Sequence, residues 1–396
     1  MKHAAILDRL TGLGGEKWVV HERARALQAE GRDVILLTVG EPDVPAPQSL
    51  IDATCDAMRA GRTGYSNGRG EAALLQALSE RYSARLGRQI TPRQFLCFPG
   101  TQTALFAVLT GLTGPGTEVL VGDPMYATYE GLIRAAGADM VPVPLHPQAG
   151  FRMRAEDLAA RLTPRSHAVL LNSPHNPTGA VLEARDIARI GALAREHDLW
   201  IITDEVYEEL IHDGTAFASP LADPALADRV IVTSSLSKSH AATGFRSGWC
   251  AGPEALITRL LPLAETMLFG NQPFIADATA TALRAPSPVA PGMRERLGQR
   301  AAMVARRLDG VGGLRVHRPQ AGMFALVDVS ATGQDGADFA MALLEETGVA
   351  VMPGSSFGAT LPGWIRLGLT VPDAVLQSAC DRIAAHAANT APAVRA

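Results

Sequence analysis

One lysine in this chain occupies a position where an amine could do chemistry. Lysine occurs only three times, as Lys2, Lys17 and Lys238, whereas the other 33 of the 36 basic residues are arginine. Lys238 lies in the segment SSLSKSHAATGFRSGW, which begins at the end of a short apolar run. An amine, unlike a guanidinium, can lose its proton near neutral pH and form a covalent imine with a carbonyl compound. Lys238 is therefore a candidate nucleophile, with a solvated surface lysine as the alternative.

Groups that could bind an anion follow two of the apolar runs. FPGTQTAL ends one run and begins a helix, so Gly100, Thr101 and Gln102 would present N–H groups and a hydroxyl at a helix N-terminus. On their own these residues could equally form an ordinary turn between a strand and a helix. Ser235 and Arg246 lie on either side of the lysine and add a hydroxyl and a cation.

Three further polar residues follow other apolar runs. Asn176 lies in NSPHNPTG, a loop made rigid by two prolines. Asp204 ends the run WIITD, and Tyr207 comes three residues later on the same helical face. A carboxylate in this place is either buried with a partner or an ordinary helix N-cap.

Together these groups match one cofactor, pyridoxal 5'-phosphate. A lysine takes its aldehyde, an arginine with helix N–H groups takes its phosphate, and an asparagine with a tyrosine takes its phenolic oxygen. A carboxylate keeps the ring nitrogen protonated, which lets the ring hold electrons. The four cysteines are far apart and have no metal-type spacing, so we expect no metal and reduced thiols.

The elements that must position these residues form an α/β fold. From Phe95 to about residue 251, seven short apolar runs are separated by helical patterns. The runs are FLCF, EVLVGDP, DMVPVP, HAVLLNSP, LWIITDE, RVIVTSS and SGWCAG. Continuous apolar strands between helices indicate a mostly parallel sheet that is buried on both faces. Ligands of such sheets bind at the carboxyl ends of the strands, where these polar residues gather.

We predict two domains. Residues 45–285 form the large domain with the seven-stranded sheet, and residues 1–44 and 286–396 form a smaller α+β domain. The smaller domain is expected to contain a long helix near 291–309 and another near 336–347. The tail, residues 387–396, has little to bury, so we expect it to be disordered.

Composition excludes several classes of partner. The formal net charge of −4 provides no basic patch for nucleic acid or for an anionic membrane. No apolar run approaches the roughly 18 residues that a membrane-spanning helix needs. The N-terminal residues lack the continuous apolar core of a signal peptide. We therefore expect a cytoplasmic protein.

Six segments resemble the class I pyridoxal-phosphate aminotransferases of fold type I: SLSKSHAATGFRSGW, NSPHNPTG, TDEVY, TVGEPD, PGSSFG and WIRLGL. They occur in the family's order over nearly the whole chain. The resemblance implies that Lys238 is the Schiff-base lysine and that Asp204 pairs with the ring nitrogen. The phosphate would be bound by Arg246, Ser235, Gly100, Thr101 and Gln102, and the phenolic oxygen by Tyr207 and Asn176.

The same resemblance gives roles to five more residues. Tyr126 would stack on the cofactor ring, and Tyr129 would be the hydrogen-bond partner of Asp204. Arg366, with the backbone of Gly40 and with Asn176, would bind the substrate α-carboxylate. Tyr65 matches a tyrosine that reaches the phosphate of the neighbouring subunit, which implies a homodimer with shared active sites.

The expected reaction moves the amino group of an L-amino acid to a 2-oxo acid such as pyruvate or 2-oxoglutarate. The alternatives are a pyridoxal-phosphate-dependent β-lyase and a regulator domain that binds the cofactor without catalysis. Some bacterial aspartate-specific members carry a lysine where this chain has Gln102, and the stretch AETMLFGNQPFIADA contains no arginine or lysine. Other stretches resemble arginine:pyruvate transaminases, which implies arginine or another non-acidic donor.

Overall fold

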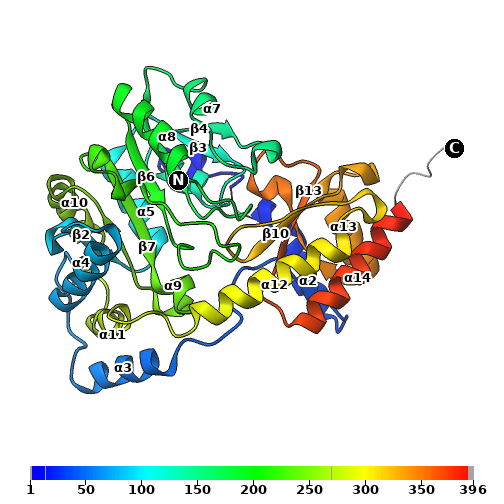
Figure 1. Ribbon diagram of the computed structural model, residues 1–396, viewed down its shortest axis with the longest axis horizontal. Helices are drawn as coiled ribbons and strands as arrows, with labels where there is room; N and C mark the ends of the chain where they lie inside the picture. Colours follow the sequence, from blue (N-terminus) through cyan, green and yellow to red (C-terminus); the bar gives the residue numbers. More distant parts are fainter. Residues whose placement is uncertain (1, 14, 269, 391–396) are drawn as a thin grey trace.

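The computed structural model describes residues 2–13, 15–268 and 270–390. A large sheet lies on the left of Figure 1 and a smaller sheet on the right. The longer helices are α2 (Val19–Ala29), α3 (Gln48–Arg59), α4 (Ala72–Leu86), α5 (Thr101–Leu112), α8 (Ala184–Glu196), α10 (Glu254–Met267), α11 (Pro273–Leu283), α12 (Ala290–Leu308), α13 (Gly336–Thr347) and α14 (Asp373–Thr390). The shorter ones are α1 (Ala5–Arg9), α6 (Tyr129–Ala135), α7 (Ala155–Ala159) and α9 (Leu236–Ser239).

The large sheet has seven strands, one for each of the apolar runs in the sequence. In spatial order they are β2 (Phe95–Phe98), β8 (Gly248–Ala251), β7 (Val230–Ser235), β6 (Trp200–Asp204), β5 (Ser166–Asn172), β3 (Glu118–Asp123) and β4 (Asp139–Pro144). β8 runs antiparallel to both of its neighbours, and the other neighbouring pairs are parallel. The predicted α/β fold with a mostly parallel seven-stranded sheet is confirmed.

Helices cover the large sheet on both faces, which explains why its strands are continuously apolar. Successive side chains of a strand point to opposite faces. In β2, Phe95 and Cys97 pack in the core under α4, α8 and α11. Leu96 and Phe98 pack in a separate core under α5, α6 and α10.

The smaller sheet is antiparallel and has the strand order β12 (Met352–Pro353), β13 (Trp364–Gly368), β10 (Phe324–Asp328) and β9 (Arg315–His317). β1 (Ile35–Leu36) pairs in parallel with β11 (Val349–Ala350), so the N-terminal segment joins the C-terminal part of the chain. α2, α12, α13 and α14 contribute to one hydrophobic core with these strands. The domain boundaries at residues 45 and 286 stay a prediction.

An ion-pair cluster fixes the segment that follows β1. Asp43 accepts hydrogen bonds from Arg296 Nε at 3.1 Å and from Arg300 Nη1 at 2.8 Å, both on α12. Arg300 is buried and also donates to the carbonyl of Leu369 at 3.0 Å. In Figure 1 the yellow helix α12 runs from the side of α9 toward α14. This helix therefore holds the segment that carries Gly40 in a defined place.

The expectation for the C-terminal tail was wrong for residues 387–390, which continue α14 to Thr390. Ala387 is fully buried in the core of the smaller sheet, and His386 beside it packs against Phe339 with the ring centroids 4.9 Å apart. This burial stabilises the last turn of the helix. Residues 391–396 lie outside the described residues. Within the described part of the chain, every helix is too short or too polar to span a bilayer.

Candidate active site

A cavity of about 300 Å³ lies where the strands β5, β6 and β7 end. Its walls come from the loops after these strands, from the start of α5, from the segment after β1 and from the smaller sheet. Twelve of the residues with a predicted role line it: Gly40, Thr101, Gln102, Tyr126, Tyr129, Asn176, Asp204, Tyr207, Ser235, Lys238, Arg246 and Arg366. The structure thus brings together residues that are up to 326 positions apart, from Gly40 to Arg366.

Lys238 lies on α9, directly after β7, and its side chain enters the cavity. Its Nζ donates a hydrogen bond to the carbonyl oxygen of Gly40 at 2.9 Å. Burial, with a smaller contribution from the nearby cations Arg246 and Arg366, lowers the pKa of this amine to about 8, whereas Glu41 and Asp204 oppose the shift. An amine with such a pKa is partly neutral near physiological pH, as a nucleophile or base must be.

Asp204 ends β6 and is buried with hydrogen-bond partners on both carboxylate oxygens. Tyr129 donates its hydroxyl proton to Oδ2 at 2.8 Å, the contact predicted for Tyr129, and the N–H of Val206 donates to Oδ1 at 3.1 Å. Burial raises the pKa of Asp204 to about 6, although these hydrogen bonds and the charge of Lys238 favour the ionised form. A cation placed against this carboxylate would lower the pKa again.

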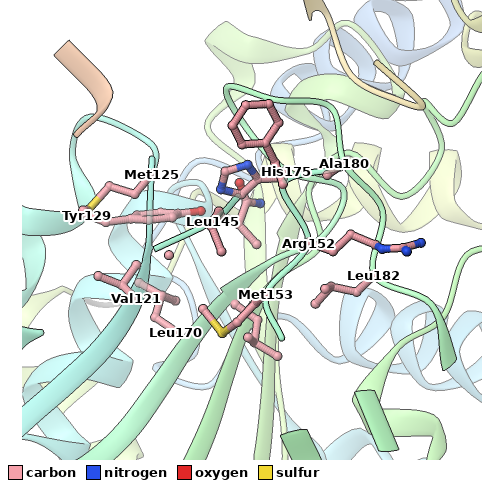
Figure 2. A pocket seen from close by; sticks show the side chains of 14 residues that line it. Val121, Met125, Tyr129, Leu145, Arg152, Met153, Leu170, His175, Ala180 and Leu182 are labelled. Atoms are coloured by element: carbon pink, nitrogen blue, oxygen red, sulfur yellow. The ribbon is translucent and has the colours of Figure 1, made fainter. Parts of the chain in front are cut away.

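A second, smaller cavity lies behind Tyr129 (Figure 2). It measures about 20 Å³, the size of one water molecule, and its walls are mainly apolar. Tyr129 and His175 both line it, and burial lowers the pKa of His175 to about 3, so this imidazole is neutral. The guanidinium of Arg152 points away from the cavity, toward Glu183 and Asp186. Tyr129 therefore packs against mainly apolar side chains on this side, while its hydroxyl donates to Asp204.

The start of α5 and the loop after α9 form an anion site. Gly100 has a φ of 90° at the N-cap of α5, and Arg246 has a φ of 51°. A left-handed conformation is costly for arginine and persists where the surroundings require it. Arg246 Nη1 donates to the carbonyl of Thr243 at 2.9 Å, which directs the guanidinium toward Gly100. The buried hydroxyl of Thr101 has no hydrogen-bond partner among the described residues. A phosphate oxygen would satisfy it.

Arg366 on β13 is only 3 % exposed and forms no ion pair with the residues that the structure describes. Its Nη2 donates to the carbonyl of Thr38 at 2.6 Å and its Nη1 to Asn176 Oδ1 at 3.3 Å. The guanidinium lies between the rings of Phe324 and Phe357, 3.9 and 4.3 Å from their centroids. Burial lowers the pKa of this group, yet it remains charged at neutral pH. A buried cation without a carboxylate partner can bind an anion from outside the chain.

Aromatic residues complete the wall around Lys238. Tyr126 and Tyr129 contact each other edge to face, with ring centroids 5.5 Å apart. Lys238 Nζ lies 6.0 Å from the ring centre of Tyr207. Burial raises the pKa of the Tyr207 phenol well above its usual value, so it keeps its proton and can donate a hydrogen bond.

Two predicted residues do not line the cavity, Gly100 and Tyr65. A side chain at Gly100 would clash with the guanidinium of Arg246, which does line the cavity. Tyr65, in the loop between α3 and α4, is 92 % exposed. The cavity also contains residues that the sequence did not reveal, among them Trp18, Val39 and Phe324. These are apolar or aromatic side chains, which carry no recognisable catalytic signal in a sequence.

Comparisons with known proteins identify the family. Residues 32–383 match the family model for class I and II aminotransferases. The chain belongs to this family. It is 45 % identical over 389 residues to an arginine–pyruvate transaminase of Pseudomonas aeruginosa, with 98 % of this chain and 99 % of that protein covered. It is 35 % identical to an aspartate/prephenate aminotransferase of Cereibacter sphaeroides, with 93 % and 95 % covered.

Solved structures agree with this assignment. The aspartate aminotransferase of Rhizobium meliloti superposes with a TM-score of 0.92 at 29 % identity, covering 98 % of this chain and 99 % of that one. The protein is therefore a pyridoxal-phosphate-dependent aminotransferase of fold type I. This finding favours transamination over the β-lyase and regulator alternatives. The roles of the individual residues stay predictions.

Proposed function

We propose that this aminotransferase takes the amino group of arginine, or of another donor without an acidic side chain, and passes it to pyruvate or 2-oxoglutarate. The observation that carries the proposal is the charge of the cavity. Among the described residues that line it, the cations are Lys238, Arg246 and Arg366. Lys238 and Arg246 would serve the cofactor, and Arg366 would serve the donor's α-carboxylate. The described lining of this cavity therefore offers no cation for a second carboxylate. The similarity to an arginine–pyruvate transaminase supports arginine in particular.

In the proposed site the cofactor is held at its three polar ends. Arg246, Ser235 and the start of α5 with Thr101 would bind the phosphate, where the unpartnered Thr101 hydroxyl supports this fit. Asp204 would bind the ring nitrogen. The phenolic oxygen would accept hydrogen bonds from Asn176 and Tyr207. The ring of Tyr126 would stack on the cofactor.

When bound, pyridoxal phosphate supplies an aldehyde that takes up the amino group and a ring that holds the electrons of the broken Cα–H bond. Arg366 would bind the donor's α-carboxylate with the backbone of Gly40 and the amide of Asn176, which fixes the direction of the Cα–H bond. The amine of Lys238 would then accept the Cα proton and return a proton during the second half of the reaction. The Phe324 and Phe357 rings keep water away from Arg366.

A donor screen tests the proposal. The purified enzyme with pyruvate or 2-oxoglutarate is expected to show its highest kcat/KM with arginine and a low value with aspartate. If aspartate were the best donor, the charge argument would be wrong.

Gln102→Lys is expected to raise kcat/KM for aspartate by about tenfold, because a new cation in the cavity could pair with the second carboxylate. Gln102 lines the cavity and its side chain forms no hydrogen bond with the described residues, so the change removes no side-chain hydrogen bond. Gln76→Lys on the exposed side of α4 is the matched control, since it adds the same charge elsewhere. An equal gain in both variants would contradict a local effect.

We also propose a cytoplasmic homodimer with shared active sites. The four cysteines are free thiols, as in a reducing compartment. Tyr65 is strongly exposed and does not line the cavity of its own chain, which supports a role in the partner's phosphate site. A phosphate hydrogen bond from Tyr65 would then complete each site across the dimer axis.

Mixing Tyr65→Ala with Lys238→Ala tests the shared site. Each variant alone is expected to be impaired. In a mixed dimer one site would receive intact Tyr65 and intact Lys238 from different chains, and the other would receive both lesions. Random exchange makes about half of the dimers mixed, so activity should return to about a quarter of the wild-type level. No recovery after subunit exchange, verified by mass spectrometry of the native dimers, would mean that Tyr65 serves its own chain.

A further inference from the structure

Part of the cavity wall has no role in the proposed binding of cofactor or α-carboxylate. The lining residues without such a role are all uncharged, and they include Trp18, Val39 and the side chain of Gln102. Their side chains are an indole, a small aliphatic group and an amide, so this part of the wall is uncharged. An α-amino acid held at its carboxylate and amino groups must place its side chain against whatever wall remains. This uncharged wall is therefore the candidate side-chain site, and Trp18 is its largest member.

Trp18 is firmly held. It ends the short helix Gly15–Trp18, and the carbonyl of Lys17 before it accepts a hydrogen bond from Ser356 Oγ at 2.9 Å. Lys17 Nζ also donates to the carbonyl of Ala127 at 3.3 Å. The indole packs in a small apolar cluster that contains Phe357, the ring that stacks on Arg366. Trp18 thus shares Phe357 as a neighbour with Arg366, the group proposed to bind the α-carboxylate, and lines the same cavity.

The chemistry of this wall suits a planar cation. A guanidinium is attracted to the face of an indole more strongly than to other aromatic rings. The amide oxygen of Gln102 has no partner among the described residues and can accept an N–H group. At the rim, the exposed Glu41 accepts a hydrogen bond from Thr243 Oγ1 at 2.8 Å and forms no ion pair with the described residues. Its charge favours a cationic donor over an acidic one.

We infer that Trp18 determines donor specificity by stacking its indole on the guanidinium of a donor bound through Arg366. The Gln102 amide accepts a hydrogen bond from the same guanidinium. The inference rests on the proposed arginine donor and deepens it by naming the residue responsible. It places the discrimination in substrate binding, because side chains that hold the donor's guanidinium take no part in removing the Cα proton.

The test measures kcat/KM of the wild type, Trp18→Leu and Trp18→Phe with three donors. Arginine and citrulline are assayed with pyruvate as acceptor, and alanine is assayed with 2-oxoglutarate. Trp18→Leu is expected to lower kcat/KM for arginine by about tenfold, or about 1.4 kcal/mol, mainly through KM. Alanine does not reach the indole, so its kcat/KM should change by less than about twofold. Citrulline has the same length without the charge and should lose less than arginine. Trp18→Phe keeps an aromatic face and should retain part of the preference.

A binding measurement supplements the kinetics. 5-Guanidinopentanoate has the carboxylate and guanidinium of arginine but no amino group, so it binds without reacting. Calorimetry with the holoenzyme should show the same tenfold loss of affinity in Trp18→Leu, or about 1.4 kcal/mol. Trp200→Leu is the matched control: Trp200 begins β6, at the opposite end of the strand from Asp204, and does not line the cavity. Its affinity for the analogue should equal that of the wild type.

The outcomes separate this inference from the proposed donor. A wild type that uses alanine but not arginine would overturn the donor proposal, and the Trp18 inference with it. A wild type that prefers arginine and keeps its full preference in Trp18→Leu would leave the donor proposal standing and overturn the inference. Equal losses for arginine and alanine in Trp18→Leu would show that Trp18 only supports the fold, which also overturns it.

Discussion

Lys238→Ala is expected to abolish transamination, with a fall in kcat of about 10²–10⁴-fold or more, because the variant loses both its nucleophile and its base. The cofactor should still bind, since the contacts proposed for its phosphate and ring do not involve Lys238. In the wild type, burial lowers the pKa of the Lys238 amine to about 8. A base acts in its neutral form, so the rate of proton removal should decrease as the pH falls below this value.

Absorption spectroscopy and mass spectrometry check this prediction. Adding an amino donor without an acceptor should bleach the visible absorption of the wild type, whereas Lys238→Ala should keep absorbing in the visible because the Cα proton is not removed. In the wild type, borohydride reduction should attach the cofactor covalently to the peptide that contains Lys238. In Lys238→Ala the same peptide should carry no cofactor. Lys2→Ala, which removes an exposed lysine near the N-terminus, is the matched control and should behave as the wild type. Partial rescue of Lys238→Ala by methylamine would identify the lost group as an amine base, whereas full turnover without any added amine would refute the assignment.

The large sheet could be predicted from the sequence because each of its strands, and each helix between them, is encoded by residues that are neighbours in the sequence. Each strand is a run of apolar residues short enough for a strand and buried on both faces, and helices with apolar periodicity lie between the runs. Polar residues at the carboxyl ends of those runs must then meet at one edge of the sheet. Asn176, Asp204 and Lys238 follow neighbouring strands and do line one cavity. Their proximity follows from topology alone.

Contacts between distant segments could not be predicted in this way. Arg366 is held between Phe324 and Phe357, and nothing in the spacing of these residues indicates that they stack. Asp43 meets Arg300 across 257 positions of sequence, and no residue near it in the sequence indicates this contact. Trp18 enters the cavity through packing of the N-terminal segment against the turn that contains Phe357. Such contacts depend on how the two sheets lie against each other, which no periodicity of a single segment encodes.

The helical end of the chain illustrates the same limit. Residues 387–390, with the sequence AANT, have small or polar side chains that indicate little to bury. In the structure Ala387 is nonetheless fully buried, because Gly312 lies directly against its backbone and leaves room for close approach. Gly312 has a φ of 57°, a conformation that glycine adopts readily. A side chain at this position would clash with the backbone of α14.

Asp204→Asn is the second change with a large expected effect. An amide has no negative charge to stabilise a protonated ring nitrogen, so the ring would hold electrons poorly in the variant. We expect kcat to fall by about a hundredfold or more, while the covalent bond to Lys238 still forms. Tyr129→Phe removes only the 2.8 Å hydrogen bond to Oδ2 and leaves the charge, so its effect should be smaller, about tenfold.

Nuclear magnetic resonance of cofactor labelled with ¹⁵N in its ring separates this effect from a loss of stability. The ¹⁵N shift should indicate a protonated ring in the wild type and a neutral ring in Asp204→Asn. Glu205→Gln provides the matched control, because Glu205 is the next buried carboxylate, with a pKa that burial raises to about 7. It accepts a hydrogen bond from Ser219 at 2.6 Å and does not line the cavity, so its loss should lower stability without moving the ¹⁵N shift. A fall in kcat of less than about tenfold in Asp204→Asn, about 1.4 kcal/mol, would mean that another group protonates the ring.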